Sequence, residues 1–179
     1  MPLYLSGSSG VSGVDGSNTT PAIQGSDTNT GMVFPVADTI AFVEGGAEVM
    51  RINSSGNVGI GNTAPTAKLH VQGAILASDN ITAYSDERLK KDITTIENAL
   101  EKVSKIRGVR YIQTNTCNPG IGLVAQEVQL VIPEVVAQNG EYLSLAYGNM
   151  VGLLIEAIKE QQEQIEVIKK ELQYIKNNI

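Results

Sequence analysis

The sequence contains few cysteine, histidine or aromatic residues, and each shortage excludes a class of structure or chemistry. Its 179 residues include one cysteine, Cys117, one histidine, His70, no tryptophan, and 4% aromatic residues. A lone cysteine excludes a framework of intrachain disulfides. A lone histidine excludes a histidine-based catalytic triad or zinc site within one chain. We therefore expect no metal centre, no bound cofactor and no large aromatic core.

Positive charge and long apolar runs are also scarce. The formal net charge is −6 and the isoelectric point is near 4.8, whereas a protein that binds the phosphate backbone needs a positively charged surface. No run approaches the ~18 apolar residues of a membrane-spanning helix. The first residues also lack the basic and apolar regions of a signal peptide. These features predict no nucleic-acid partner and no membrane insertion.

Residues 1–77 are typical of short β segments separated by turns. Brief apolar or β-branched runs alternate with Gly-Gly and Ser-Ser-Gly-Asn breakers. The glycines from Gly56 to Gly61 fit such turns, because their order is not that of a dinucleotide-binding loop. A segment this thin cannot bury enough apolar surface to offset its chain entropy. We therefore expect an interwound, β-rich trimeric stalk whose core and strand edges other copies complete. A linker at 78–84 follows it.

Residues 85–146 predict a small α+β domain. Thr94 and Glu97 have the spacing of a capping box ahead of an amphipathic pattern, which predicts a helix over about 95–106. The stretch GVRYIQ predicts a strand. Together the two elements indicate a mixed domain of short helices and strands.

Two further patterns extend this domain toward its end. The stretch GIGLVAQEVQLVIP predicts a short apolar strand that runs into a helix stopped by Pro133. The stretch EVVAQNGEYLSL predicts a hairpin with Asn139 and Gly140 as its two-residue turn.

Residues 147–179 predict one long helix with a heptad repeat, hence a parallel trimeric coiled coil. Isoleucine in both apolar rows favours more than two strands, and Glu171 and Lys176 fit an interchain ion pair. Gln161 is the polar residue that would fix the register. The alternative is an amphipathic helix that lies on its own domain. The a positions are Val151, Ile158, Ile165, Leu172 and Ile179, and the d positions are Leu154, Gln161, Ile168 and Ile175.

The stretch YSDERLKKDI, which begins at Tyr84, lies where the uncharged half gives way to the charged half. Ser85 could act as a nucleophile with Lys90 as its base, provided that the lysine is neutral. Burial between chains, or nearby cations such as Arg88, would favour the neutral form. The same residues equally fit a helix N-cap followed by acidic residues in the first turn.

Several blocks in this order resemble the C-terminal intramolecular chaperone domain of phage tailspikes and tail fibres. The blocks are SDERLKKDI, GVRYIQ, GIGLVAQEVQLVIPEVV and EYLSLAYGNMVGLLIEAIKEQQEQI, and the resemblance covers about residues 83–179. Endosialidase tailspikes, neck-appendage proteins and the myelin regulatory factor carry this auto-processing Ser-Lys peptidase domain. The upstream segment TNTGMVFPVADTIAFVEGGAEVMRINSSGNVGIGNTAPTAKLHVQG resembles the repeat-like β segments of tail fibres more loosely.

The resemblance implies a fold, an activity and a location. The family domain trimerises, helps the upstream β fibre to fold, and then cuts itself off before the motif serine. Carried over, Ser85 is the nucleophile, Lys90 the general base and Asp86 a supporting residue, and the scissile bond joins Tyr84 to Ser85. The location is a virion tail fibre or spike assembled in the host cytoplasm. The partners are two further copies, other virion tail proteins or a host-cell receptor.

Two other functions compete with self-cleavage. The first is an uncleaved structural trimer that serves as a fibre cap or receptor-binding tip. The second is a carbohydrate-cleaving tailspike, which would use two carboxylates in a groove. The stalk is too short for a large catalytic domain, although it contains the acidic residues Asp15, Asp27, Asp38, Glu44 and Glu48.

Overall fold

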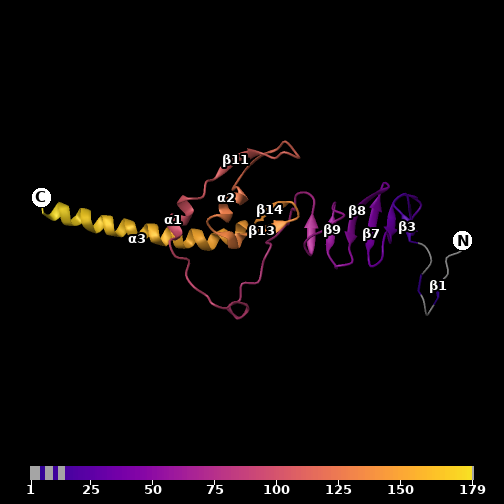
Figure 1. Ribbon diagram of the computed structural model, residues 1–179, viewed down its shortest axis with the longest axis horizontal. Helices are drawn as coiled ribbons and strands as arrows, with labels where there is room; N and C mark the ends of the chain where they lie inside the picture. Colours follow the sequence, from indigo (N-terminus) through magenta and orange to yellow (C-terminus); the bar gives the residue numbers. More distant parts are fainter. Residues whose placement is uncertain (1–4, 7–9, 12–14, 179) are drawn as a thin grey trace. The chain divides into compact units, whose positions relative to one another are not determined.

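The computed structural model describes residues 5–6, 10–11 and 15–178 (Figure 1). The chain divides into two compact units, Met1–Ala83 and Tyr84–Ile179. The first unit contains strands and turns, and the second contains helices and small sheets. The expectation of an α+β chain is therefore confirmed.

The first unit is built around a six-stranded sheet with the order β10-β9-β8-β7-β6-β5. Neighbouring strands are antiparallel, except that β9 and β10 are parallel. Each strand thus pairs with the strand next to it in the sequence. The strands are β5 Ile23–Gln24, β6 Gly31–Val33, β7 Ile40–Glu44, β8 Ala47–Ile52, β9 Val58–Ile60 and β10 Leu69–Val71. Two small hairpins pair β1 Leu5–Ser6 with β2 Gly10–Val11 and β3 Gly16–Ser17 with β4 Thr20–Pro21.

Turn chemistry explains why the strands follow one another so closely. Gly45 and Gly46 join β7 to β8 with φ angles of 58° and 80°, which glycine adopts at little steric cost. Between β8 and β9, the side-chain oxygen of Asn53 accepts hydrogen bonds from the backbone N–H groups of Ser55 and Asn57. This local bonding favours a turn over a continued strand.

The buried core of the first unit is small. It consists of Val33, Ala41 and Val43, on the adjacent strands β6 and β7. Such a core removes little apolar surface from water, so the unit gains little stability from its own packing.

In the second unit, residues of several short elements form a core with the N-terminal part of one long helix. Its elements are η1 Glu87–Leu89, α1 Ala99–Ser104, β11 Val109–Ile112, β12 Pro119–Gly122, α2 Ala125–Gln129, η2 Pro133–Val135, β13 Val136–Asn139, β14 Tyr142–Leu145, η3 Tyr147–Asn149 and α3 Met150–Asn177. The predicted strand at GVRYIQ and the predicted long helix are confirmed. The core consists of Ala99, Val128, Val135, Met150, Leu153 and Ala157.

The structure corrects two local predictions. The hairpin of β13 and β14 pairs Asn139 with Tyr142, so its two-residue turn is Gly140–Glu141 and not Asn139–Gly140. Gly140 has a φ of 60°, which satisfies the first position of a primed turn. The helix α2 ends at Gln129, and Pro133 begins η2 instead of stopping α2, because proline lacks only a donor that the first turn leaves unused.

The predicted capping box of Thr94 and Glu97 is wrong, because α1 begins at Ala99 with Asn98 as an N-cap that makes no side-chain bond. Glu160 of α3 replaces it. Its two carboxylate oxygens accept hydrogen bonds from the backbone nitrogens of Ala99 and Leu100, at 2.7 and 2.8 Å. These bonds lower the pKa of Glu160, since they stabilise the charged carboxylate. A residue 61 positions away thus fixes the start of α1.

The helix α3 buries one face in its own unit and leaves the heptad face open. Met150, Leu153 and Ala157 are its buried residues, and all lie in its first eight positions. The predicted a and d positions lie elsewhere on the helix, so α3 is not simply an amphipathic helix that lies on its own domain. The exposed fractions of Val151, Leu154, Ile158, Ile165, Ile168, Leu172 and Ile175 range from 40 to 65%. Ile179 lies outside the described residues. Among the helices described, none has the length and apolar content to cross a membrane.

Leu153→Ala should lower the free energy of unfolding of the second unit by about 2–5 kcal/mol, because it leaves a cavity at a fully buried site. Urea unfolding followed by circular dichroism measures this change. Leu130→Ala removes the same atoms from a side chain that is 88% exposed, and should change stability little. Equal losses in the two variants would contradict the core described above.

Glu160→Gln should lower the thermal midpoint at neutral pH, because an ionised cap is replaced by a neutral one. The folded-state pKa of Glu160 lies below its ordinary value of 4.5. Its contribution is therefore present above that ordinary value and is lost as the pH falls through the lowered one. Melting curves at neutral and acidic pH should show the gap between wild type and variant closing in acid. Glu163→Gln, at an exposed position of the same helix, should show no such gap.

Candidate functional site

The motif serine lies at the end of a long irregular segment. Residues 72–86 form neither helix nor strand, and η1 begins at Glu87. The predicted linker at 78–84 falls inside this segment. The boundary between the two compact units falls between Ala83 and Tyr84, one bond before the proposed cleavage site. Ser85 is thus the second residue of the second unit.

Asp86, and not Ser85, caps the turn that follows. Its Oδ1 accepts a hydrogen bond from the backbone nitrogen of Arg88 at 2.9 Å. The guanidinium of Arg88 also donates to Asp86, with Nε at 2.9 Å from Oδ1 and Nη2 at 2.7 Å from Oδ2. These contacts lower the pKa of Asp86. The prediction that the serine is an N-cap is therefore wrong, and its hydroxyl is left for another partner.

That partner is Lys90. The 3-10 turn η1 brings the chain back on itself, and the backbone nitrogen of Lys90 donates to the carbonyl oxygen of Glu87 at 2.9 Å. The Lys90 Nζ then donates to the Ser85 Oγ at 2.8 Å. A single turn thus places the two predicted catalytic side chains within hydrogen-bond distance. This is the separation that a nucleophile and its base require.

The site is open to solvent within one chain. Ser85 and Lys90 are both exposed, and the side chain of Tyr84, before the predicted scissile bond, is 96% exposed. A lysine accepts a proton only from its neutral form, which desolvation favours. The surroundings of Lys90 in the single chain do not provide that desolvation.

The role of Arg88 was not predicted from the sequence, where this residue counted only as a nearby cation. The signal was available in the order Asp-x-Arg at the start of a turn. An N-cap carboxylate and an arginine two residues later can form a bidentate pair as well as a cap. Asp86 therefore supports the local geometry through Arg88.

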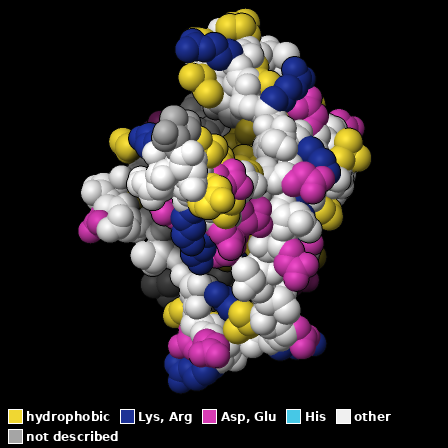
Figure 2. Space-filling model, turned by 90° about the vertical axis from the view of Figure 1, so that its left-hand side faces the viewer, with side chains coloured by type: hydrophobic (Ala, Val, Ile, Leu, Met, Phe, Trp, Pro, Cys, Tyr) yellow, Lys and Arg dark blue, Asp and Glu magenta, His cyan; other side chains and the backbone are white. Residues whose placement is uncertain are grey.

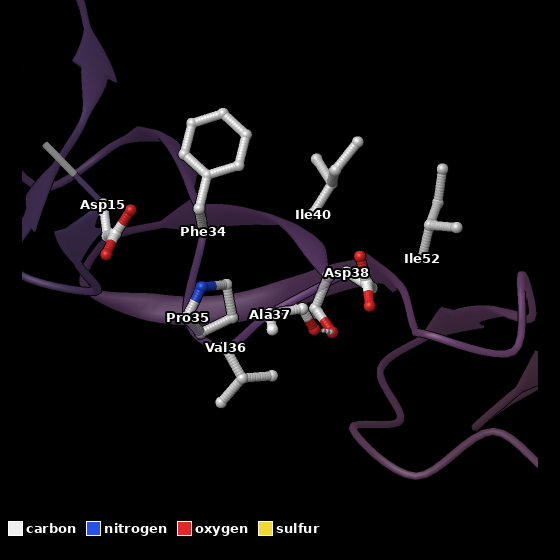
Figure 3. Close-up of a pocket in the computed structure, with 9 residues that line it drawn as sticks. Asp15, Phe34, Pro35, Val36, Ala37, Asp38, Ile40 and Ile52 are labelled. Atoms are coloured by element: carbon white, nitrogen blue, oxygen red, sulfur yellow. Dashed lines mark hydrogen bonds between the residues drawn. The ribbon is translucent and has the colours of Figure 1, made fainter. Parts of the chain in front are cut away.

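A separate pocket in the first unit bears on the carbohydrate-cleaving alternative. It has a volume of about 780 Å³, and Asp15 and Asp38 are the acidic residues that line it. Figure 3 shows Pro35 and Ala37 between these two carboxylates, so they do not form a close pair. A glycosidase needs two carboxylates that flank one bond.

Two further acidic residues of the first unit, Asp27 and Glu48, have local contacts. Asp27 accepts a hydrogen bond from Thr30 Oγ1 at 2.8 Å. Glu48 binds Arg51 through both of its oxygens, and Glu44 is exposed at the end of β7. These contacts hold turns and strands, which gives the carbohydrate-cleaving alternative no structural support.

The surface charges are mixed in sign. On the face shown in Figure 2, Lys and Arg side chains lie interspersed with Asp and Glu side chains. Such a distribution differs from the continuous positive surface that nucleic-acid backbones attract.

The second unit matches a known family. Residues 85–137 match the family described as chaperone of endosialidase, and the match begins at Ser85. This part of the protein is a chaperone-of-endosialidase domain. The match thus starts at the residue that Lys90 contacts.

The chain is also similar to phage and animal proteins. The chain is 41% identical over 92 residues to long tail fiber protein Gp37 of Escherichia phage AR1, which covers 45% of this chain and 8% of that protein. It is 27% identical over 173 residues to Gp37 of Enterobacteria phage M1, covering 85% and 69%. It is 33% identical over 135 residues to myelin regulatory factor homolog 1 of Caenorhabditis elegans, covering 69% and 14%. The chain thus spans about 8% of the length of the AR1 protein.

Asp86→Ala should loosen the turn that holds Ser85 beside Lys90, because the cap and the bidentate partner of Arg88 are both lost. Hydrogen exchange followed by NMR should show faster exchange of the Arg88 amide. Glu87→Ala removes a carboxylate from the same turn but keeps the cap, so its Arg88 amide should remain protected. Equal exchange in both variants would show that Asp86 does not hold the turn.

Proposed function

We propose that this chain is the C-terminal part of a phage tail fibre whose chaperone domain assembles three copies, promotes folding of the upstream β stalk, and then cuts itself off. The observation that carries the proposal is the 2.8 Å contact between Lys90 Nζ and Ser85 Oγ, at the first residue of the family match. The tail fibre relatives support a virion component. The proposed scissile bond joins Tyr84 to Ser85.

Assembly is proposed to proceed through α3. Its a and d side chains are largely exposed although they are apolar, and their heptad spacing fits a parallel three-stranded coiled coil. Two further copies would cover these side chains. The gain in buried apolar surface is the driving force.

Cleavage is proposed to follow assembly because Lys90 must lose its contact with water. Packing of three chains around the turn would desolvate the amine and favour its neutral form. Neutral Lys90 would then accept the proton of the Ser85 hydroxyl, and Oγ would attack the carbonyl carbon of Tyr84. The C–N bond breaks as the Ser85 nitrogen takes the proton, and water hydrolyses the resulting ester. The products are a Tyr84 carboxylate and a new amino terminus at Ser85.

The coupling of cleavage to assembly would make the fold of the stalk effectively irreversible. Unassembled chains, whose lysine is solvated, would not cleave. After cleavage, the β stalk would lose the segment that guided its folding, and it would be kinetically trapped. Because strand pairing between chains is slow and prone to aggregation, prior registration by a coiled coil reduces that hazard.

A second candidate function is an uncleaved trimer that caps the fibre or forms its receptor-binding tip. The exposure of Ser85, Lys90 and Tyr84 in one chain favours it. In that case the contact between Ser85 and Lys90 stabilises the turn and performs no chemistry. The partners would then be host-cell receptors or other tail proteins.

Mass spectrometry of the freshly purified full chain distinguishes these functions. Self-cleavage predicts a fragment that begins at Ser85. Ser85→Ala should abolish it, and Lys90→Ala should slow its formation by about 10²–10⁴-fold, the usual effect of losing a general base. Lys91→Ala removes the neighbouring lysine and should leave cleavage intact. An intact wild-type chain, or equal cleavage in all variants, would leave the uncleaved cap or tip as the function.

A further inference from the structure

The register of the six-stranded sheet aligns apolar side chains into a continuous row. Residues that are directly opposite on neighbouring strands project to the same side of a sheet. Following the register across the sheet gives one residue from each strand. The row consists of Ile23, Met32, Phe42, Met50, Ile60 and Val71.

A second row lies on the same side of the sheet, two residues away from the first row on β7, β8, β9 and β10. It consists of Ile40, Ile52, Val58 and Leu69. We call the two rows together the apolar face. None of its members is buried, and the exposed fractions of Ile23, Ile40, Ile60 and Leu69 range from 37 to 56%. Figure 3 shows Ile40 and Ile52 pointing to the same side of the sheet, together with Phe34.

Part of the opposite side of the sheet is covered by the chain itself. It carries the buried core of Val33, Ala41 and Val43 and the ion pair of Glu48 with Arg51. The loop between β9 and β10 also crosses it, because a Cβ atom built on Gly59 would lie 2.1 Å from the carbonyl oxygen of Asn62. The unit therefore has one side with its own core and one side whose apolar residues are only half-buried or exposed among the described residues.

We propose that the apolar face is the surface at which β-rich units of different copies of this chain meet, side by side, in parallel and in register. This inference rests on the proposed assembly of three copies and identifies the surface and the direction of packing. The sides that carry the Glu48–Arg51 pair would face outward.

The exposed heptad face of α3 identifies another copy as the occupant, because the proposed coiled coil brings two further copies of the same chain alongside. Each chain carries a formal net charge of −6, so copies pack closely only where their contact surface is uncharged. The two rows contain no charged or polar side chain. The acidic residues beside them are Glu44, at the end of β7, and Asp15 and Asp38, which are exposed and line one pocket together with Ile40 and Ile52. A copy of the same face therefore covers apolar rows, and no member of those rows leaves a charge buried and unpaired.

The order of the strands determines the direction in which the copies pack against one another. Since each strand pairs with its neighbour in the sequence, the rows run along the sheet in steps of about 4.8 Å per strand. Parallel copies in register bring each strand beside the same strand of the next copy, so equivalent side chains meet along the whole row. The parallel coiled coil proposed for α3 imposes the same direction.

Thiol labelling of the full chain tests the proposal. In a Cys117→Ser background, Ile23→Cys and Ile60→Cys place a thiol on the apolar face, and Gln24→Cys places one on the other side of β5. All three positions are exposed in one chain. In protein that sediments as an assembly, the first two variants should lose most of their maleimide labelling, and Gln24→Cys should label fully.

The outcomes separate this inference from the proposed function. An assembled chain in which all three thiols label alike overturns the inference and leaves the proposed assembly in place. A wild-type chain that sediments as a single copy at micromolar concentration overturns both. Ile165→Asp with Leu172→Asp disrupts the heptad face, and a single-copy chain with these changes should regain labelling at Ile60→Cys. Protection that persists in such a single copy means that the chain covers its own face, which also overturns the inference.

Discussion

The main constraint on this molecule is that, among the described residues of a single chain, each unit buries only a small part of its apolar surface. The first unit encloses Val33, Ala41 and Val43, and the second encloses a few side chains around the first turns of α3. Most of the large apolar side chains of α3 remain exposed. Because burial of apolar surface is the main favourable contribution to folding, the proposed assembly of copies would add stability that the single chain lacks.

Long-range and local interactions stabilise different parts of the second unit. Glu160 links α1 to α3 over 61 positions, and it does so with both carboxylate oxygens on backbone nitrogens. The Asp86–Arg88 pair acts over two positions and shapes a single turn. The first interaction makes the docking of α1 depend on the position of α3. The second is independent of both helices, so the turn and the helical core can form separately.

The helices and strands that could be predicted from the sequence are those whose formation depends on one local pattern. The heptad spacing predicted α3, and GVRYIQ predicted β11. The family resemblance singled out Ser85 and Lys90, because their spacing alone equally fitted an N-cap at the serine. The short turn between them places Lys90 Nζ 2.8 Å from Ser85 Oγ. The N-terminus of α1 could not be predicted, since Thr94 and Glu97 offered a local cap whereas a distant glutamate supplies the cap. The hairpin turn was misplaced by one residue because Asn139-Gly140 is a common turn pair, whereas the pairing of Asn139 with Tyr142 decided the register.

The shortness of the turn at η1 has a consequence for timing during synthesis. All the contacts that hold Ser85 beside Lys90 lie between residues 85 and 90. The pair can therefore form as soon as this hexapeptide leaves the ribosome, while the remainder of the domain is still being translated. Geometry alone provides no delay. In the proposed cleavage, the restraint on premature reaction would therefore come from the water around the Lys90 amine, so hydration of that amine would set the time of the reaction.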